Sequence, residues 1–180
     1  MAKRAIRRDI TEAEIEGRHQ AREYARFIRQ HIAGCEQSFL NDTGVQVGVR
    51  RTRQVAAVKT LTNQDVITKT KSAAGIARSP WPIEMHSGEK PRLVWLFNDF
   101  YEVPYECFVP VKGESLLVAG RCLSAEHEAM ASARVTAQCF SYGHAIGHAA
   151  AMAVQEGISP RSISCTALRK RLNRDGARLD

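Results

Sequence analysis

SLLVAGRCLSAEHEAMASARVTAQCFSYGHAIGHAAAM, residues Ser115–Met152, joins a short apolar run to a polar loop and then to a long segment rich in small residues. The run Leu116–Ala119 has the composition of a buried strand, which we expect to end at Gly120. A strand, a loop and a helix in this order are typical of a cofactor site lined by backbone. The chain contains no GxGxxG turn, the usual seat of a dinucleotide pyrophosphate.

The long segment predicts a helix from about Val135 or Thr136 to Glu156, with Gly157 as its C-cap. The first N–H groups of such a helix are unpaired and partly positive, and Arg134 adds a cation beside them. Its small residues would let a sheet, a helix or a planar cofactor approach closely: Gly143, Ala145, Gly147, Ala149, Ala150, Ala151 and Ala153. The alternative is that these residues only allow tight packing in a protein core.

The composition is that of a folded domain without a membrane anchor. A chain of 180 residues is long enough for one domain with a core. Its residues are 44% hydrophobic and 25% charged, which is ordinary for a folded domain. No window approaches ~18 uninterrupted apolar residues, and the charged N-terminal stretch lacks the apolar segment of a secretory signal. We therefore expect a cytoplasmic protein. The five cysteines are odd in number, scattered and outside any CxxC pair, which favours free thiols over disulfides or a zinc ribbon.

The net charge of +7 is concentrated in three clusters, Lys3–Arg8, Arg50–Arg53 and Arg169–Arg178. Clusters of Lys and Arg can neutralise the phosphates of nucleic acids. No aromatic residues are interleaved with these clusters and no nucleic-acid motif is present, so we expect no nucleic-acid partner. Solvated faces explain the charge better, as does a surface that meets an anionic cofactor or an acidic partner segment.

Capping and turn signals divide the remainder of the chain. Thr11 and Glu14 form a capping-box pattern that predicts a helix to about Ile32. The alternation in Val45–Arg50 predicts a strand, and Gln54–Val58 a second short one. The other expected elements are a capped helical turn at Thr62–Asp65, a loop-rich region at Ser72–Arg92 with a short extended piece at Trp81–His86, a short or edge strand within Phe100–Val111, and a last helix from Ser164 to Asp175.

Four motifs occur in the same order in a known family: Val47–Arg53 (VGVRRTR), Tyr105–Pro110 (YECFVP), Leu116–Cys122 (LLVAGRC) and Ser132–Val135 (SARV). The chain resembles the C-terminal part of the FAD-dependent oxidoreductases, a family that includes proteins similar to the heterodisulfide reductase A subunit. Thr11–Arg18 is similar to the family's helix before the VGVR strand, so the resemblance covers nearly the whole chain. Each motif alone is weak, and the ordered set is fairly specific.

The resemblance implies an α/β fold, in which the C-terminal portion of an FAD-binding dinucleotide fold follows the tail of an α+β substrate or cap domain. Residues 1–112 would be that tail, and residues 113–180 the C-terminal segment of the FAD-binding domain. The residues that it assigns to the cofactor form two groups: Ala119, Gly120 and Arg121 along the FAD, and Arg134, Val135 and Thr136 near the isoalloxazine. A cation and helix N–H groups beside the flavin would stabilise its reduced, anionic form.

Few catalytic side chains are needed in such an enzyme, because the flavin itself transfers the hydride. His127 and Arg134 are the best candidates, since they flank the loop between the cofactor strand and its helix. His127 can act as an acid or a base near neutral pH, but it is equally consistent with a histidine on a surface loop. A structural role better explains the weaker candidates: His86, Tyr105, Cys122 and Cys139.

His144 and His148 lie one helical turn apart, where members of the family commonly have Gln and Thr. Such a pair can bind a metal. Ala145, however, stands where an HExxH zinc protease requires Glu, so we expect ordinary polar packing and no metal site. The dispersed cysteines lack the ligand spacing of an iron–sulfur cluster.

Two functions from different classes remain open. The chain is either a fragment or subunit of an FAD-dependent oxidoreductase that acts on a small-molecule substrate, or a non-catalytic interaction chain that binds no flavin by itself. In the first case, a separate N-terminal segment of the FAD domain would supply the GxGxxG turn, or the chain would work as a homo-oligomer. We expect no membrane partner in either case.

Overall fold

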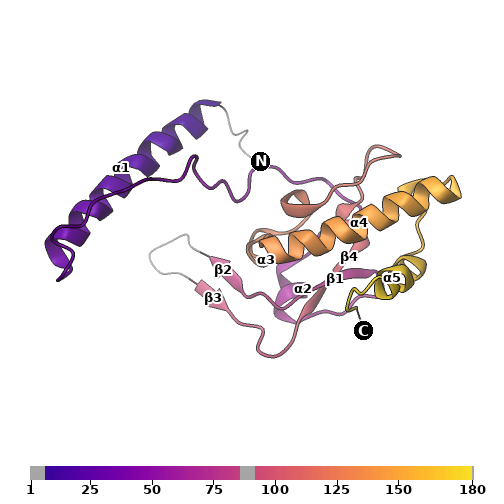
Figure 1. The fold of residues 1–180 in the computed structure, drawn as a ribbon. Helices are drawn as coiled ribbons and strands as arrows, with labels where there is room; N and C mark the ends of the chain where they lie inside the picture. Colours follow the sequence, from indigo (N-terminus) through magenta and orange to yellow (C-terminus); the bar gives the residue numbers. More distant parts are fainter. Residues whose placement is uncertain (1–6, 86–91, 180) are drawn as a thin grey trace. The chain divides into compact units, whose positions relative to one another are not determined.

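The computed structural model describes residues 7–85 and 92–179 of the chain (Figure 1). Its contacts divide the chain into two compact units, Met1–Thr52 and Arg53–Asp180. The division after residue 112 that the resemblance implies concerns domains of the family and stays a prediction. Within the described residues, no helix is both long and apolar enough to cross a membrane.

The first unit is built on one long helix, α1 (Arg7–His31). The expected start at Thr11 is wrong, because the helix already includes the residues before it. Asp9 lies in the first turn, where its carboxylate faces the positive end of the helix dipole. The expected end near Ile32 is confirmed within one residue, and Gly34 follows with φ +85°, a conformation that favours glycine.

The chain after α1 returns along the helix. Arg18 Nη1 donates a hydrogen bond to Thr43 Oγ1 at 2.8 Å, and the Val47 N–H donates to the Glu14 carboxylate. The strand expected at Val45–Arg50 is wrong, since these residues belong to neither sheet and Val45 is 94% exposed. An alternating pattern forms a strand only where a second strand pairs with it, and here a helix side chain accepts from the backbone.

None of the described side chains in the first unit is buried. We therefore expect trypsin to cut first at Arg50, Arg51 or Arg53, in an exposed segment without helix or strand. Limited proteolysis with mass spectrometry measures the order of the cuts. Earlier cleavage within the last helix of the second unit, α5 (Cys165–Arg174), would contradict this expectation.

The second unit contains two small antiparallel sheets, of which one lies among the helices and the other lies to one side (Figure 1). The first pairs β1 (Gly75–Ser79) with β4 (Tyr101–Pro104), and the second pairs β2 (Ile83–Met85) with β3 (Arg92–Val94). The short strand expected within Phe100–Val111 is confirmed as β4. Within the region expected to be rich in loops, Ser72–Arg92, β2 confirms the short extended piece expected at Trp81–His86, whereas β1 is a strand that was not expected. The mixture of helices and small sheets is consistent with the expected α/β class.

Local signals correctly predicted three helices of this unit. The capped helical turn expected at Thr62–Asp65 is confirmed as α2 (Asn63–Ile67), where Thr62 and Asp65 form a capping box. The long helix α4 (Thr136–Glu156) ends at Gly157, whose φ is +64°, and the Ser164 side chain caps α5 by accepting from the Ala167 N–H. The remaining elements are α3 (His127–Ala133) and three short 3-10 turns: η1 (Tyr105–Phe108), η2 (Gly120–Cys122) and η3 (Pro160–Ser162).

The buried strand expected at Leu116–Ala119 is wrong. These residues form a loop in which Leu116 is 53% exposed, and the Val118 N–H donates to the Phe108 carbonyl at 3.0 Å. The second expected strand, Gln54–Val58, is reduced to one isolated bridge between Ala57 and Pro110. Both apolar runs pack against irregular chain, so neither acquires the ladder of hydrogen bonds that defines a strand.

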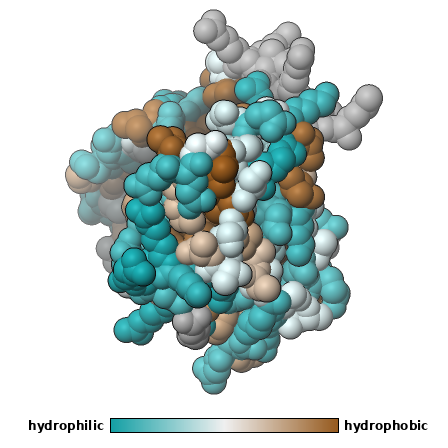
Figure 2. Space-filling view, turned by 90° about the vertical axis from the view of Figure 1, so that its right-hand side faces the viewer, coloured by the Kyte–Doolittle hydropathy of each residue, from teal (hydrophilic) through white to brown (hydrophobic). Residues whose placement is uncertain are grey.

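The core lies where the helices cover the strands. Helices α4 and α5 pack on β1, α3 packs on β2 and α2, and η2 packs on α4. The rings of Phe108 and Tyr142 meet in this core with their centroids 5.0 Å apart. Figure 2 views the side on which α4 and α5 lie in Figure 1, where mostly hydrophilic side chains surround a narrow band of more hydrophobic ones.

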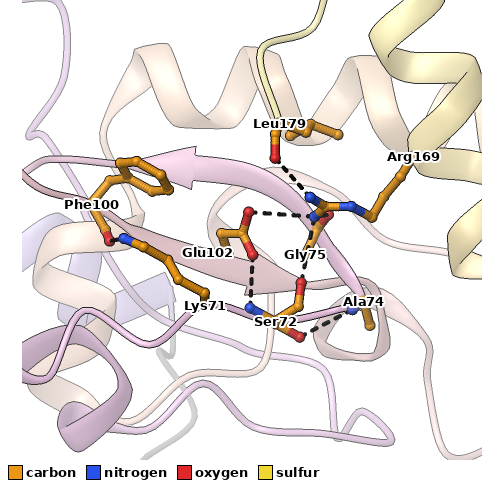
Figure 3. A network of polar contacts seen from close by, with 8 residues as sticks. All are labelled: Lys71, Ser72, Ala74, Gly75, Phe100, Glu102, Arg169 and Leu179. Carbon is orange, nitrogen blue, oxygen red and sulfur yellow. Dashed lines mark hydrogen bonds and ion pairs between the residues drawn. The ribbon is translucent and has the colours of Figure 1, made fainter.

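A buried ion pair connects α5 with the β1–β4 sheet (Figure 3). Arg169 Nη1 lies 3.4 Å from Glu102 Oε1, and Arg169 Nη2 donates to the Leu179 carbonyl at 2.7 Å. The Glu102 carboxylate, only 6% exposed, also accepts from the Ser72 N–H at 2.7 Å. Arg169 further donates to the Gly75 carbonyl. One guanidinium group therefore links a strand, a helix and the residues that follow α5.

Two buried groups make the second unit sensitive to alkaline pH. Burial raises the pKa of the Cys107 thiol from its ordinary 9.0 to about 12 and the pKa of Tyr101 from 10.0 to about 12. The unfolded chain loses these protons first, so the free energy of unfolding should fall as the pH rises above 9.0. Urea titrations at a series of pH values measure this slope. The variant Cys107→Ala should make it shallower, and an unchanged slope would contradict the assignment.

Candidate functional site

The turn η2 lies against α4 and presents open backbone at Gly120. Gly120 has φ +78°, and no neighbouring atom lies within 4 Å of the position that a Cβ would occupy. The turn is closed locally, because the Leu123 N–H donates to the Gly120 carbonyl at 3.2 Å and the Cys122 thiol to the Ala119 carbonyl at 3.1 Å. A ligand could therefore approach the backbone at Gly120 without meeting a side chain.

The first turn of α4 has no side-chain cap. Val135 is the N-cap residue, with an extended backbone and an apolar side chain that cannot accept a hydrogen bond. The Cys139 N–H donates to the Val135 carbonyl at 3.1 Å, which closes the first helical turn. Thr136 and Ala137 are exposed. The start of α4 therefore offers backbone donors and a partial positive charge to the surface.

Each of these two segments carries or adjoins an arginine, Arg121 in η2 and Arg134 directly before the N-cap of α4. Arg134 is half-buried and directly follows α3, and its carbonyl accepts from the Cys139 thiol at 3.5 Å. Partial burial raises the pKa of the Cys139 thiol, and the nearby Arg121 guanidinium counteracts this rise. Arg121 of η2 and the first turn of α4 are thus close in space. The contact between η2 and α4 thus places Arg121 near the helix that begins at Thr136, and the role of these residues in cofactor binding stays a prediction.

His127 does not join this cluster. It is the exposed first residue of α3, whereas Arg134 follows the last, so the length of the helix, roughly 10 Å, separates them. The polar loop expected here is wrong, because α2 organises the segment as a helix. The Asn63 side chain accepts from the Ala129 N–H at 2.9 Å, and the Asn63 N–H donates to Glu126 at 2.7 Å. An acid–base role for His127 stays a prediction.

Comparison with known proteins identifies the family. The model of the family described as FAD dependent oxidoreductase matches residues 2–172. The chain belongs to this family. Oxidoreduction is the general function of FAD dependent oxidoreductases, and FAD is their cofactor. No curated protein and no solved structure matches the chain.

The residues of this FAD dependent oxidoreductase fit the polar edge of a flavin. Two arginines, uncapped helix donors and open backbone at Gly120 suit a ring system that carries hydrogen-bond acceptors and becomes anionic on reduction. The sequence lacks the GxGxxG turn that binds the pyrophosphate of FAD, so no such motif is present for the adenosine and pyrophosphate half of the cofactor. The fit is therefore to the flavin end of FAD.

The other sequence candidates have structural surroundings. Tyr105 is buried, its hydroxyl donates to the Pro160 carbonyl at 2.8 Å, and burial raises its pKa. Cys122 and Cys139 are half-buried free thiols. The fully buried thiol is Cys107. His86 lies outside the described residues.

A cluster that the sequence did not predict lies further along α4. His148 Nε2 is 3.2 Å from His144 Nε2 and 3.0 Å from Asp175 Oδ2, the carboxylate at the end of α5. Within residues 7–85 and 92–179, no group of three His, Cys, Asp or Glu side chains is arranged to hold a metal ion. The spacing of the two histidines was visible in the sequence, but the packing of α5 on α4 supplies Asp175.

Proposed function

We propose that this chain supplies the flavin-facing part of an FAD-dependent oxidoreductase and corresponds to the C-terminal part of the relatives of the heterodisulfide reductase A subunit. The observation that carries the proposal is the packing of η2 against the uncapped start of α4, with Arg121 and Arg134 beside it. FAD, when bound, supplies the chemistry of hydride or electron transfer. The substrate would be a small molecule, and the location the cytoplasm.

Each residue of the cluster has a defined task in this proposal. The N–H groups of Thr136 and Ala137 and the charge of Arg134 would orient the pyrimidine edge of the isoalloxazine and favour negative charge there. Arg121 would add a second cation. Gly120 would allow the ring to approach the backbone, because a side chain would fill this open space. We further propose His127 as an acid–base group that reaches the substrate from the start of α3.

The exposed face of α4 supports a partner in the complete enzyme. Phe140 is 75% exposed and Val154 83% exposed, and Gly143 and Gly147 have no neighbour within 4 Å of their Cβ positions. Apolar and small residues on one face of a helix are suited to packing against a sheet or a second helix. We propose that a separate segment of the dinucleotide fold, which carries the GxGxxG turn, or a second copy of the chain covers this face.

Amide chemical shifts of the chain during a titration with FAD test the assignment. We expect the largest changes at Gly120 and Thr136. Arg134→Gln should weaken binding about tenfold, the effect of losing one charge-assisted hydrogen bond. Arg174→Gln, which removes the same charge from the end of α5, is the matched control and should have little effect.

The alternative function predicts a different result. A purified chain that is colourless, takes up no added FAD and has unchanged amide shifts at Gly120 and Thr136 would be the non-catalytic interaction chain. A flavin spectrum with shifts confined to other residues would keep the cofactor but contradict the site.

A further inference from the structure

A second candidate site lies away from the flavin-facing cluster. A pocket of about 320 Å³ is bounded by β1, α4 and the residues that follow α5. Its polar and charged lining consists of Arg78, Ser141, His144, Asp175 and Arg178. The volume is that of a site for a small organic molecule. His144 is eight residues after Thr136 on α4, about 12 Å along the helix axis, so this pocket and the start of α4 are separate places.

Arg78 lines this pocket, and among the described residues it has no counter-ion. Its guanidinium group lies 4.3 Å from the centre of the Phe100 ring, and its Nε is buried without a hydrogen-bond partner. Among the described residues, no carboxylate forms an ion pair with Arg78. Buried N–H groups of charged side chains are nearly always paired in native proteins. The guanidinium group therefore carries a positive charge that no described carboxylate neutralises.

The other charged residues of the pocket, Arg178 and Asp175, also favour an anion. Within the described part of the chain, Arg178 has no ion-pair partner. Asp175, the carboxylate of the lining, already accepts from His148, whose Nε2 lies 3.0 Å from Asp175 Oδ2. The positive charges of the pocket are thus left uncompensated, while its negative charge is engaged.

A histidine lines the same pocket. His144 belongs to its wall, and its Nε2 lies 3.2 Å from His148 Nε2, which lies 3.0 Å from Asp175 Oδ2. An imidazole ring has two nitrogens, so a nitrogen of His144 that carries a proton can donate a hydrogen bond to a ligand.

We propose that this pocket binds a small oxyanion, which pairs with Arg78 and Arg178 and accepts a hydrogen bond from His144. Both a carboxylate and a phosphate group have this chemistry, because guanidinium groups bind either one through parallel hydrogen bonds. The site is separate from the flavin-facing cluster. It would bind a second ligand, or the anionic group of a substrate.

NMR spectra of the histidine rings during titrations with inorganic phosphate, and separately with succinate, test the proposal at constant ionic strength. Saturable shifts of His144 and His148 are expected. Arg78→Gln and Arg178→Gln should each weaken binding about tenfold, and Arg78→Lys should give an intermediate affinity because it keeps the charge. Tighter binding of phosphate or of succinate identifies the anionic group for which the pocket is built.

Arg174→Gln is the control, since it removes the same charge from an exposed position next to the pocket. Equal weakening by this variant would mean that the anion is attracted only by the general positive charge, and the proposal would be wrong. The absence of saturable shifts with both anions would also overturn it, as would histidine shifts that respond to Zn²⁺ and to neither anion. Thermal unfolding checks each variant, and the exposed Arg178 carries the test if Arg78→Gln does not fold.

Discussion

Replacing Arg169 by alanine should lower the free energy of unfolding by about 3 kcal/mol, because it leaves a buried carboxylate without its counter-ion. Glu102 is only 6% exposed, and the Arg169 side chain 20% exposed, so water cannot replace the guanidinium group fully. The same change also removes the donors to the carbonyls of Gly75 and Leu179 (Figure 3). Urea unfolding followed by circular dichroism measures the loss.

Two further variants separate the ion pair from other effects of the substitution. Arg174→Ala, on the exposed face of the same helix, should change the free energy of unfolding by less than about 0.5 kcal/mol. Adding Glu102→Gln to Arg169→Ala should recover part of the lost stability, since a buried neutral amide costs less than a buried carboxylate. If Arg169→Ala and Arg174→Ala lose the same stability, the buried pair does not hold α5 to the sheet.

Elements with local signals could be predicted from the sequence. The capping box of Thr62 and Asp65, the cap at Ser164 and the left-handed Gly157 each act within a few residues of the helix end that they define. Elements that depend on distant partners could not be predicted. The start of α3 has no side-chain cap of its own and is organised by Asn63.

Whether an apolar run becomes a strand also depends on a pairing strand that is distant in the sequence. The apolar run Leu116–Ala119 has no strand beside it and stays irregular, whereas Gly75–Ser79 is a strand because it pairs with β4 and is covered by α4 and α5. Gly75 is required there by its neighbour and not by its backbone angles, since a Cβ would lie 2.8 Å from Glu102. Nothing near Gly75 in the sequence indicates this contact.

The candidate site also contains parts that local sequence signals predict and parts that depend on distant contacts. Gly120 and the start of α4 could be recognised from composition, and η2, the turn that contains Gly120, packs on α4. His127 was assigned to the wrong kind of segment, because the helix that separates it from Arg134 is formed through contacts with α2. The pocket of Arg78 and His144 joins β1, α4 and the chain end, a combination without any sequence motif.

Replacing Tyr142 by alanine should destabilise the second unit by about 4 kcal/mol, since it removes a fully buried aromatic side chain from the centre of the core. The Tyr142 ring packs against Phe108, and its hydroxyl donates to the Ala133 carbonyl at 3.0 Å. This hydrogen bond connects the middle of α4 with the end of α3, immediately before Arg134. The loss of free energy is measured by urea unfolding.

The matched control is Phe140→Ala, which removes a comparable ring from the same helix at a position that is 75% exposed, and its effect should stay below about 0.5 kcal/mol. Tyr142→Phe keeps the packing and should cost about 1 kcal/mol through the lost hydrogen bond. Because that bond holds the residue before Arg134, Tyr142→Phe should also weaken FAD binding at the start of α4. Full affinity in a folded Tyr142→Phe variant would mean that the junction of α3 and α4 is positioned without this hydroxyl.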